Sequence, residues 1–348
     1  MSSKIKAAII GYGKSGKNIH APLIDARDDI ILSAVLKRSG PDRLADRPDI
    51  ELFRDMITLL KNDSITLVII TTPNHLHYRM AEQALNAGKH VVVDKPFTVT
   101  SNEAEKLIDL AEKKGRVLSV FQNRRWDGDF LTVAKLLNEK SVGRLVEFES
   151  NFNRFRSELR DDAWKEMSLP GSGILYDLGP HLIDQALQLF GKPDSLRADI
   201  RKQRGGDTDD WFEIDLYYNG FKAKLKAGML IMDDTPRFVL RGDGGAYVKY
   251  GFDPQEQALS DGVDPKRHDW GTEEESKFGI LRFRKEGRVE HVRVKTAPGN
   301  YPHFYRNVVD AIQKSSELSV KPTEAKEVIR IIELAEKSND KKKVLSVI

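Results

Sequence analysis

Hydrophobic residues are distributed differently in the two parts of this chain. In the first 121 residues they form short, continuous aliphatic runs, which is typical of strands buried on both faces of a parallel sheet. Segments with helical periodicity lie between these runs. The predicted strands are 5–10, 30–36, 65–70, 90–93 and 116–120, and the predicted helices are 17–26, 79–87 (with Gly88 as C-cap) and 102–114. This alternation indicates a parallel sheet with right-handed crossover connections.

Beyond residue 121 the character of the chain changes. We predict strands at 145–155, 210–218, 221–230, 237–241, 278–284 and 288–294, and late helices at 304–314 and 323–338. Most of these strands are separated by short turns of Gly, Asp or Asn, and Asn219-Gly220 is a strong hairpin signal. The second part therefore favours a mainly antiparallel sheet.

The first predicted strand runs directly into a glycine motif, Gly11-x-Gly13-x-x-Gly16, which a helix can follow. This order is the context that the dinucleotide-binding fingerprint requires, although an ordinary glycine-rich turn is the alternative. Gly11 permits the tight turn, Gly13 lets a pyrophosphate approach the backbone, and Gly16 lets helix and strand pack closely. Free N–H groups at the helix start supply an anion site. Tyr12 and Ser15, inside the motif, are candidate cofactor contacts as well.

The turn after the second predicted strand is basic and reads Lys37-Arg38-Ser39. Sites that prefer NAD usually place Asp or Glu here, whereas an Arg accommodates the 2′-phosphate of NADP. Arg38 can fork onto a phosphate, Ser39 can donate its hydroxyl, and Lys37 adds charge. A solvated basic turn is the alternative. We predict NADP(H) as the cofactor.

Two further turns follow strands of the predicted parallel sheet, at the carboxyl edge where α/β sheets bind ligands. Thr71-Thr72-Pro73-Asn74-His75-Leu76-His77 should border the cofactor. A Pro-Asn turn that opens a helix, with His77 on the surface, is the equally weighted alternative. The second turn is Asp94-Lys95-Pro96. Lys95 can hydrogen-bond a substrate hydroxyl and stabilise a developing alkoxide, and Pro96 stiffens the turn.

Asp177 and His181 are four residues apart where a helix is predicted to begin, which would place both on one helical face. A carboxylate beside an imidazole is a general-base arrangement, because His titrates near neutrality and Asp can orient it. In the alternative, Asp177 caps the helix and Pro180 lies in its first turn. Asp184 belongs either to the same polar face or to the surface.

Composition limits the class of protein. The chain has 348 residues, 40% hydrophobic and 31% charged, which fits a soluble protein with two domains. A formal net charge of +3 gives little support to nucleic-acid binding, and zero cysteines exclude disulfides, thiolate catalysis and Cys-ligated metal sites. The first strand starts too early for a signal peptide, and no apolar run is long enough to cross a bilayer. We expect a cytoplasmic protein without membrane contact.

In their order and spacing, these motifs resemble those of the Gfo/Idh/MocA family (glucose–fructose oxidoreductase, inositol dehydrogenase and relatives) over essentially the whole chain. The carrying residues are the glycine fingerprint, the turn 71–77, Asp94-Lys95-Pro96 and Gly173-x-x-x-Asp177-x-Gly179-x-His181. The resemblance implies an α/β fold. An N-terminal Rossmann parallel-sheet domain (residues 1–121) would precede a C-terminal α/β domain (residues 122–348) with a large, mainly antiparallel open sheet. It also implies the catalytic set Lys95, Asp177 and His181, and a homo-oligomer, dimer or tetramer.

Within the family, the chain is most similar to NADP-dependent scyllo-inositol dehydrogenases and neighbouring sugar or polyol oxidoreductases. The residues behind this narrower likeness are Gly11-Tyr12-Gly13 with His20-x-Pro22-Leu23, Lys37-Arg38-Ser39, Asn123-Arg124-Arg125-Trp126-Asp127 and Leu175-Tyr176-Asp177-Leu178-Gly179. One position departs from the family pattern, because the tripeptide usually begins with Glu and here begins with Asp94. The shorter side chain predicts longer contacts to cofactor or backbone, while Lys95 is retained.

The resemblance implies hydride transfer between a carbinol carbon and the nicotinamide. His181 would accept the hydroxyl proton, Asp177 would hold its ring, and Lys95 would bind the same oxygen, so that no metal is required. Asn123 and Trp164 are further candidate cofactor contacts. The candidate substrate contacts for a small polyol or sugar are Arg125, Trp126, Arg154, Lys165 and Tyr301, with His303 beside Tyr301. For each of these the alternative is a strand-surface charge or a core aromatic.

Two other functions fit the same fold. One is a family oxidoreductase that acts on another sugar or on a dihydrodiol. The other is a non-catalytic NADP(H)-binding sensor, a class that tends to lose the catalytic set. Because Lys95, Asp177 and His181 are all present, the sequence favours an enzyme.

Overall fold

The computed structural model describes residues 4–40, 43–44, 47–160 and 164–348, which form two compact units. Unit 1 consists of Met1–Asn123, Gln255–Trp270 and Tyr301–Glu327, and unit 2 consists of Arg124–Pro254, Gly271–Asn300 and Val328–Ile348. The first segment of unit 1 ends close to the boundary expected at residue 121. In addition, two later segments of the chain fold with that unit.

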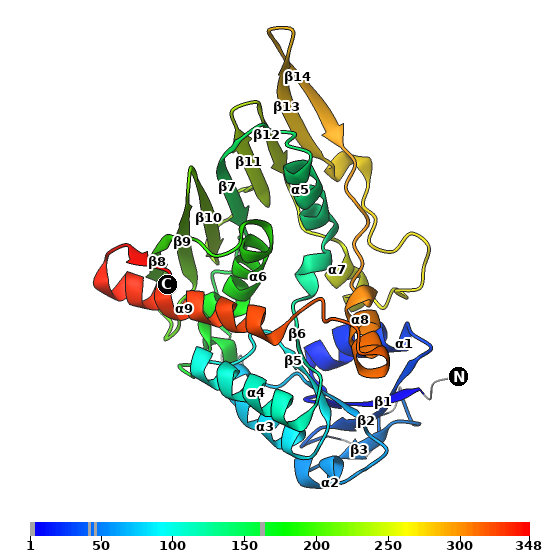
Figure 1. Ribbon diagram of the computed structural model, residues 1–348. Coiled ribbons are helices and arrows are strands. Elements are labelled where there is room, and N and C mark those ends of the chain that lie inside the picture. Colours follow the sequence, from blue (N-terminus) through cyan, green and yellow to red (C-terminus); the bar gives the residue numbers. More distant parts are fainter. Residues whose placement is uncertain (1–3, 41–42, 45–46, 161–163) are drawn as a thin grey trace. The chain divides into compact units, whose positions relative to one another are not determined.

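The described part of unit 1 contains a six-stranded parallel sheet, in the order β3-β2-β1-β4-β5-β6 (Figure 1). Its strands are β1 (Ile5–Ile10), β2 (Ile30–Leu36), β3 (Glu51–Phe53), β4 (Leu67–Ile70), β5 (His90–Asp94) and β6 (Leu118–Phe121). This is the doubly wound Rossmann order, in which the strand order reverses between β1 and β4. The predicted parallel sheet is therefore confirmed. The three-residue β3 was not predicted.

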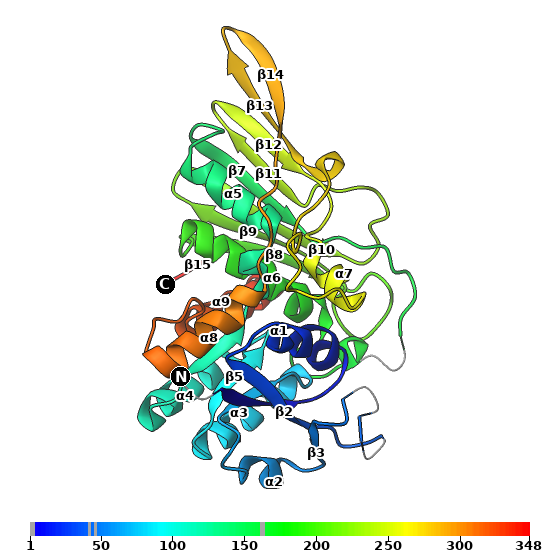
Figure 2. The ribbon, with the colours of Figure 1, turned by 90° about the vertical axis from the view of Figure 1, so that its right-hand side faces the viewer.

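Helices cover both faces of this sheet, with α1 and α8 on one face and α3 and α4 on the other (Figures 1 and 2). Their bounds are α1 (Ala21–Asp25), α2 (Met56–Leu60), α3 (His77–Asn86), α4 (Ser101–Lys114), α7 (Gln255–Ser260) and α8 (Pro302–Lys314). Helix α4 starts with a capping box, because Thr100 Oγ1 accepts the Glu103 N–H and Glu103 accepts the Thr100 N–H. It ends at Gly115, whose φ is +60°.

Unit 2 is built on a nine-stranded sheet, in the order β14-β13-β12-β11-β7-β10-β9-β8-β15. The strands are β7 (Leu145–Asn151), β8 (Ser195–Arg201), β9 (Trp211–Tyr218), β10 (Phe221–Gly228), β11 (Phe238–Gly242), β12 (Gly245–Lys249), β13 (Gly279–Lys285), β14 (Arg288–Val294) and β15 (Leu345–Ser346). Among the described strands of this sheet, only β7 and β10 pair in parallel. This confirms the mainly antiparallel sheet, and the Asn219-Gly220 hairpin joins β9 to β10 as predicted.

One face of the unit 2 sheet packs against helices. These are α5 (Gly128–Asn138), α6 (Gly173–Phe190) and the second part of α9 (Pro322–Lys341). The buried residues of β9 and β10 alternate, and Phe212, Ile214 and Leu225 belong to this core. The opposite face carries lysines of β10 paired with carboxylates of β9, such as Lys224 with Glu213 at 2.5 Å.

The part of β8 that extends beyond its pairing with the two-residue β15 is closed by side chains of α9. The N–H groups of Ala198 and Ile200 donate to Ser338 Oγ and Asn339 Oδ1, both at 3.1 Å. An edge strand with unpaired N–H groups can pair with another chain, so these contacts protect it. The sequence did not predict β8, β12, β15, α2, α5 or α7.

Candidate active site

The glycine turn after β1 has the geometry that the sequence predicted. Gly11 has a φ of +96°, and a Cβ on it would lie 2.9 Å from the Thr71 carbonyl oxygen. A Cβ on Gly16 would lie 2.8 Å from the Gly11 carbonyl oxygen and 3.0 Å from the side chain of Ile9. Glycine at both positions therefore lets the turn close against β1 and β4.

The same turn leaves open space at Gly13. This residue is exposed, and a Cβ on it would meet nothing within 4 Å. The chain continues through a π-helical turn, Gly16–His20, into α1. An open backbone at a helix start fits a diphosphate, because N–H groups there point outward. Tyr12, inside the turn, is buried.

The basic turn after β2 is held by backbone contacts, while its predicted ligands face solvent. Arg54 donates to the carbonyl oxygens of Lys37 and Gly40, both at 2.9 Å. Arg38 and Ser39 are exposed, and Lys37 is half-buried. The turn thus presents a guanidinium and a hydroxyl at the carboxyl end of β2.

His77 lies in neither of the two environments expected for it, because it is fully buried and bonded to backbone. Its Nδ1 lies 2.8 Å from the Pro96 carbonyl oxygen, and its Nε2 lies 2.8 Å from the Thr72 carbonyl oxygen. Burial lowers the pKa of His77, although both carbonyl contacts oppose this shift. His77 joins the turn after β4 to the turn after β5, and its ring nitrogens are not left to bind a cofactor.

The rest of the turn after β4 borders the glycine turn. Thr71 Oγ1 donates to the Gly11 carbonyl oxygen at 2.5 Å. Thr72 and Pro73 are half-buried, and Asn74 is buried. The turn therefore supports the glycine motif directly, and its contact with a cofactor stays a prediction.

Asp94, at the end of β5, accepts hydrogen bonds from the turn that follows it and from the glycine turn after β1. Its Oδ1 accepts the Lys95 N–H at 2.8 Å and its Oδ2 accepts the Ser15 hydroxyl at 2.6 Å. Burial alone would raise the pKa of Asp94, but His20, Lys95 and Ser15 outweigh it and hold the pKa well below its usual range. The shorter Asp side chain thus makes bonds of ordinary length. Lys95 is half-buried, Pro96 is buried, and the peptide bond between them is cis.

In unit 2, Asp177 and His181 lie one turn apart on α6, with His181 buried and Asp177 half-buried. The helix begins at Gly173, so Asp177 lies beyond its first turn and Pro180 lies inside the helix. The capping alternative for Asp177 is therefore wrong. The distant Asp209 binds the first N–H groups of α6 instead, at Ile174 and Leu175.

Lys165 and Trp164, in the loop before α6, lie beside this helical face. Lys165 Nζ donates to Asp177 Oδ1 at 2.5 Å, and it lies 5.8 Å from the centre of the Trp164 ring. Arg154 packs its guanidinium over the Phe152 ring at 4.9 Å and is half-buried. Lys165 is therefore the predicted substrate residue that contacts a predicted catalytic side chain.

Arg125 has a different environment from the one expected of a substrate ligand. It is buried and forms a two-pronged ion pair with Asp184, through Nε at 2.8 Å and Nη2 at 2.6 Å. The Nε–Nη2 edge of its guanidinium is thus committed to α6. Asp184 belongs to the interior, and not to the surface.

The other candidates from these segments are mostly buried. In unit 1, Tyr301 is fully buried and its N–H donates to Gln255 Oε1 at 2.7 Å, Asn123 is buried, and His303 is half-buried. Trp126, in unit 2, is half-buried. The burial of Tyr301 places its side chain in the core of unit 1.

The sequence analysis did not single out several polar residues that lie beside the candidate residues in each unit. His20 and Tyr305 are fully buried in unit 1 and bond to each other at 2.6 Å. Asp209 is half-buried in unit 2, where loss of solvation raises its pKa to about 6. The only sequence signal for His20 was its place in the family-like His20-x-Pro22 segment.

Other kinds of site receive no support from the described residues. No cluster of three or more His, Asp or Glu side chains there could hold a metal ion. None of the helices in that part of the chain has the length and apolar character needed to cross a membrane.

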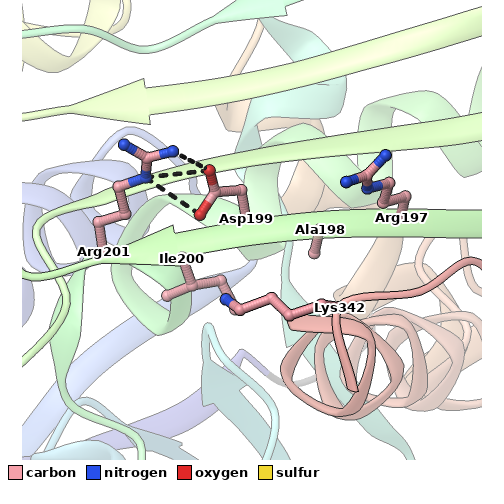
Figure 3. Close-up of a pocket in the computed structure, with 6 residues that line it drawn as sticks. All are labelled: Arg197, Ala198, Asp199, Ile200, Arg201 and Lys342. Atoms are coloured by element: carbon pink, nitrogen blue, oxygen red, sulfur yellow. Dashed lines mark hydrogen bonds and ion pairs between the residues drawn. The ribbon is translucent and has the colours of Figure 1, made fainter. Parts of the chain in front are cut away.

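A polar pocket runs along β8, lined by Arg197, Asp199, Arg201 and Lys342, and Arg201 is paired with Asp199 (Figure 3). It contains none of the predicted site residues.

Known proteins share both the sequence and the fold. The chain is 44% identical over 336 residues to the uncharacterized oxidoreductase YdgJ of Escherichia coli, with 96% of each chain covered. It is 37% identical over 342 residues to the scyllo-inositol 2-dehydrogenase (NADP(+)) IolW of Bacillus subtilis, which covers 98% of this chain and 95% of IolW. The solved structure of the yvaA protein of Bacillus subtilis has a TM-score of 0.96 at 36% identity and covers 100% of this chain and 99% of that one.

Two family models match in sequence. The model for the NAD-binding Rossmann fold of the GFO_IDH_MocA oxidoreductase family matches residues 5–122. The model for the C-terminal α/β domain of the same family matches residues 134–347. Together they span both parts of the chain in the expected order. The chain therefore belongs to the Gfo/Idh/MocA oxidoreductase family.

Proposed function

We propose that the protein is an NADP(H)-dependent oxidoreductase that interconverts a secondary alcohol of a polyol, scyllo-inositol or a similar one, and the corresponding ketone. The observation that carries the proposal is on α6, where Asp177 and His181 lie one turn apart and Lys165 holds Asp177 at 2.5 Å. A carboxylate and an imidazole on one helical face provide an oriented general base. The similarity to IolW, which is named for NADP and scyllo-inositol, supports the choice of cofactor and substrate.

The residues of unit 1 fit a dinucleotide. The exposed Gly13 turn would take the diphosphate, and Arg38 and Ser39 would take a 2′-phosphate. The other residues proposed to hold the cofactor are Gly11, Tyr12, Ser15, Gly16, Lys37, Thr71, Thr72, Pro73, Asn74, Asp94, Lys95, Pro96, Asn123 and Trp164. When bound, the nicotinamide supplies or accepts the hydride.

His181 acts as the general base in the oxidative direction. Its Nδ1 is buried, so Nε2 is the ring nitrogen that takes the proton from the substrate hydroxyl. Asp177 stabilises the imidazolium that forms, because the carboxylate is one helical turn away and carries the opposite charge. In ketone reduction the same proton returns to the oxygen.

The two lysines have separate tasks. Lys95 donates a hydrogen bond to the reacting oxygen and stabilises its negative charge as the proton leaves. Lys165 holds the Asp177 carboxylate in place through their ion pair. An ammonium group has three N–H donors, and Asp177 uses one. The remaining donors of Lys165 can bind a hydroxyl next to the reacting carbon, which a polyol provides. Arg154 is proposed as a further substrate contact.

The test is a spectrophotometric assay of the purified protein at the nicotinamide band. NADP+ and NAD+ are each combined with scyllo-inositol, myo-inositol, simple sugars and glucosides. We expect reduction of NADP+ in preference to NAD+, with scyllo-inositol among the best substrates. NADPH binding without turnover of any compound would contradict the proposed reaction and favour a sensor. Turnover of a sugar alone would retain the mechanism and replace the substrate.

A further inference from the structure

Four side chains from three segments of unit 1 lie in a row behind the glycine turn, joined by two hydrogen bonds and one longer polar contact. Ser15 Oγ donates to Asp94 Oδ2 at 2.6 Å, His20 Nε2 lies 3.6 Å from the same oxygen, and His20 Nδ1 lies 2.6 Å from the Tyr305 hydroxyl. His20 and Tyr305 have 0% exposed area. Neither ring can therefore touch a ligand directly, and any role must act through Asp94 and Ser15.

The protonation of Tyr305 and Asp94 is set by their surroundings. Burial raises the pKa of Tyr305 well above its usual value, so its hydroxyl keeps its proton, whereas Asp94 is ionised. The Tyr305 hydroxyl and His20 Nδ1 therefore share one hydrogen bond, and Nε2, on the other side of the ring, faces the Asp94 carboxylate at 3.6 Å. The Ser15 hydroxyl and the His20 ring both lie against the same Asp94 oxygen.

Aromatic packing fixes His20 between these partners. Its ring lies 4.2 Å from the Phe121 ring centre, and Phe121 packs edge-on against Phe304 with centres 4.9 Å apart. Phe304 and Tyr305 belong to α8, which follows β6 by about half of the chain. The imidazole thus has little freedom to turn away from Asp94 or Tyr305.

The Asp94 carboxylate joins the two cofactor turns. One oxygen binds the backbone N–H of Lys95, and the other binds Ser15, which lies between Gly13 and the π-helical turn. Movement of the carboxylate would therefore move both the Lys95 backbone and the start of the anion-binding helix. A displacement of about 1 Å in such groups is costly for binding and catalysis.

We propose that His20 and Tyr305 are positioning residues for the dinucleotide: they orient Asp94, which in turn fixes Ser15 and the turn that carries Lys95. The inference rests on the dinucleotide-binding part of the proposed function. It assigns to α8 a role in cofactor binding, although neither Tyr305 nor His20 needs to contact the cofactor.

The test is a double-mutant cycle on NADPH affinity, measured by fluorescence titration without substrate. Tyr305→Phe removes one hydroxyl and keeps the ring, and we expect about three- to tenfold weaker binding, as for loss of one buried hydrogen bond. Asp94→Asn should weaken binding more, because it removes the charge. In the double variant the fold-losses should not multiply, because Tyr305 acts through Asp94.

Tyr247→Phe is the matched control, because Tyr247 is also fully buried but lies in unit 2, and its hydroxyl has no hydrogen-bond partner in the described residues. It should leave the affinity unchanged and combine multiplicatively with Asp94→Asn. Hydrogen exchange of the apo protein gives a second readout: Tyr305→Phe should speed amide exchange at residues 11–20, and Tyr247→Phe should not. If Tyr305→Phe does not fold, the same double-mutant cycle on NADPH affinity is measured with Ser15→Ala in its place, combined with Asp94→Asn.

Two results would overturn the inference. One is wild-type NADPH affinity and wild-type exchange at residues 11–20 in Tyr305→Phe. The other is independent, multiplicative losses in the double variant. A wild-type protein that does not bind NADPH at all would instead refute the proposed function, so the two failures are distinguishable.

Discussion

The carboxylate of Asp209 accepts the backbone N–H of Leu175 at 2.7 Å and so caps α6 from a loop 34 residues further along the chain. Its backbone carbonyl accepts the Ile174 N–H at 3.0 Å. Gly173 makes this approach possible, because a Cβ there would lie 2.0 Å from Asp209 Oδ1. The helix that carries Asp177 and His181 thus begins at a half-buried carboxylate.

This contact predicts a pH dependence of stability. Burial raises the pKa of Asp209 from 3.8 to about 6, although the α6 N–H groups oppose the shift. Between pH 4 and 6 the folded protein keeps a proton that the unfolded chain has lost, so the free energy of unfolding falls as pH rises through this window. Two pH units correspond to roughly 3 kcal/mol. Urea unfolding should show that Asp209→Asn removes this part of the pH dependence.

The exposed Asp63 provides the control for this experiment. Asp63→Asn should leave the pH dependence of the wild type unchanged. If the unfolding free energies of Asp209→Asn and wild type ran parallel from pH 4 to pH 7, the carboxylate would not titrate as described.

Arg125→Ala should strongly destabilise unit 2. The Arg125 and Asp184 side chains are 6% and 3% exposed, and removal of one partner leaves the other as an uncompensated buried charge. We expect a loss of roughly 3–5 kcal/mol in the free energy of unfolding, measured with urea. Lys314→Ala breaks the exposed Lys314–Asp310 pair and should cost about 1 kcal/mol or less. Equal, small losses in both variants would argue against a structural role for Arg125.

His181→Ala should remove catalysis and leave cofactor binding intact. Loss of a general base lowers kcat by about 10²- to 10⁴-fold, while His181 makes no proposed contact to the dinucleotide. Steady-state kinetics with the best substrate and NADPH titration give the two numbers. His291→Ala, on the exposed face of β14, is the control. Wild-type turnover in His181→Ala would show that another group takes the proton.

Arg38→Asp should change the choice of cofactor. The exposed guanidinium is lost and a carboxylate is placed where a ribose 2′-hydroxyl can be bound, so affinity for NADPH should fall by roughly ten- to hundredfold and that for NADH should rise. Titration with both cofactors measures the preference. Arg284→Asp, on the exposed part of β13, serves as the charge-matched control. An unchanged preference would exclude Arg38 from the phosphate site.

Features with a local cause were predictable from the sequence. Gly11 and Gly16 are needed because a Cβ would collide with neighbouring backbone, and a motif of a few residues records that requirement. The strands of the Rossmann sheet carry continuous apolar runs because both of their faces are buried. Strand β3 has only three residues, which is too short for a recognisable pattern. Strand β8 does alternate apolar with polar residues, which is a strand pattern that the sequence analysis overlooked.

Features set by distant partners were not predictable. His77 looks like any histidine at a helix start, and only the folded chain brings its ring between the carbonyls of Thr72 and Pro96. Arg125 looks like a substrate ligand until Asp184 is seen beside it. The cap of α6 comes from Asp209, outside the window in which a capping residue is sought. In each case, tertiary packing decides which of two chemically reasonable roles the residue has.

The interleaving of the two units has a consequence for protein engineering. A fragment that ends at residue 123 would contain all six strands of the Rossmann sheet but would lack Tyr305 and Phe304, which cover His20 and Phe121. It would expose aromatic surface and leave His20 without its hydroxyl partner. A functional exchange of cofactor-binding units between relatives therefore requires transplanting three segments of chain together, because a single crossover after β6 separates residues that form one core.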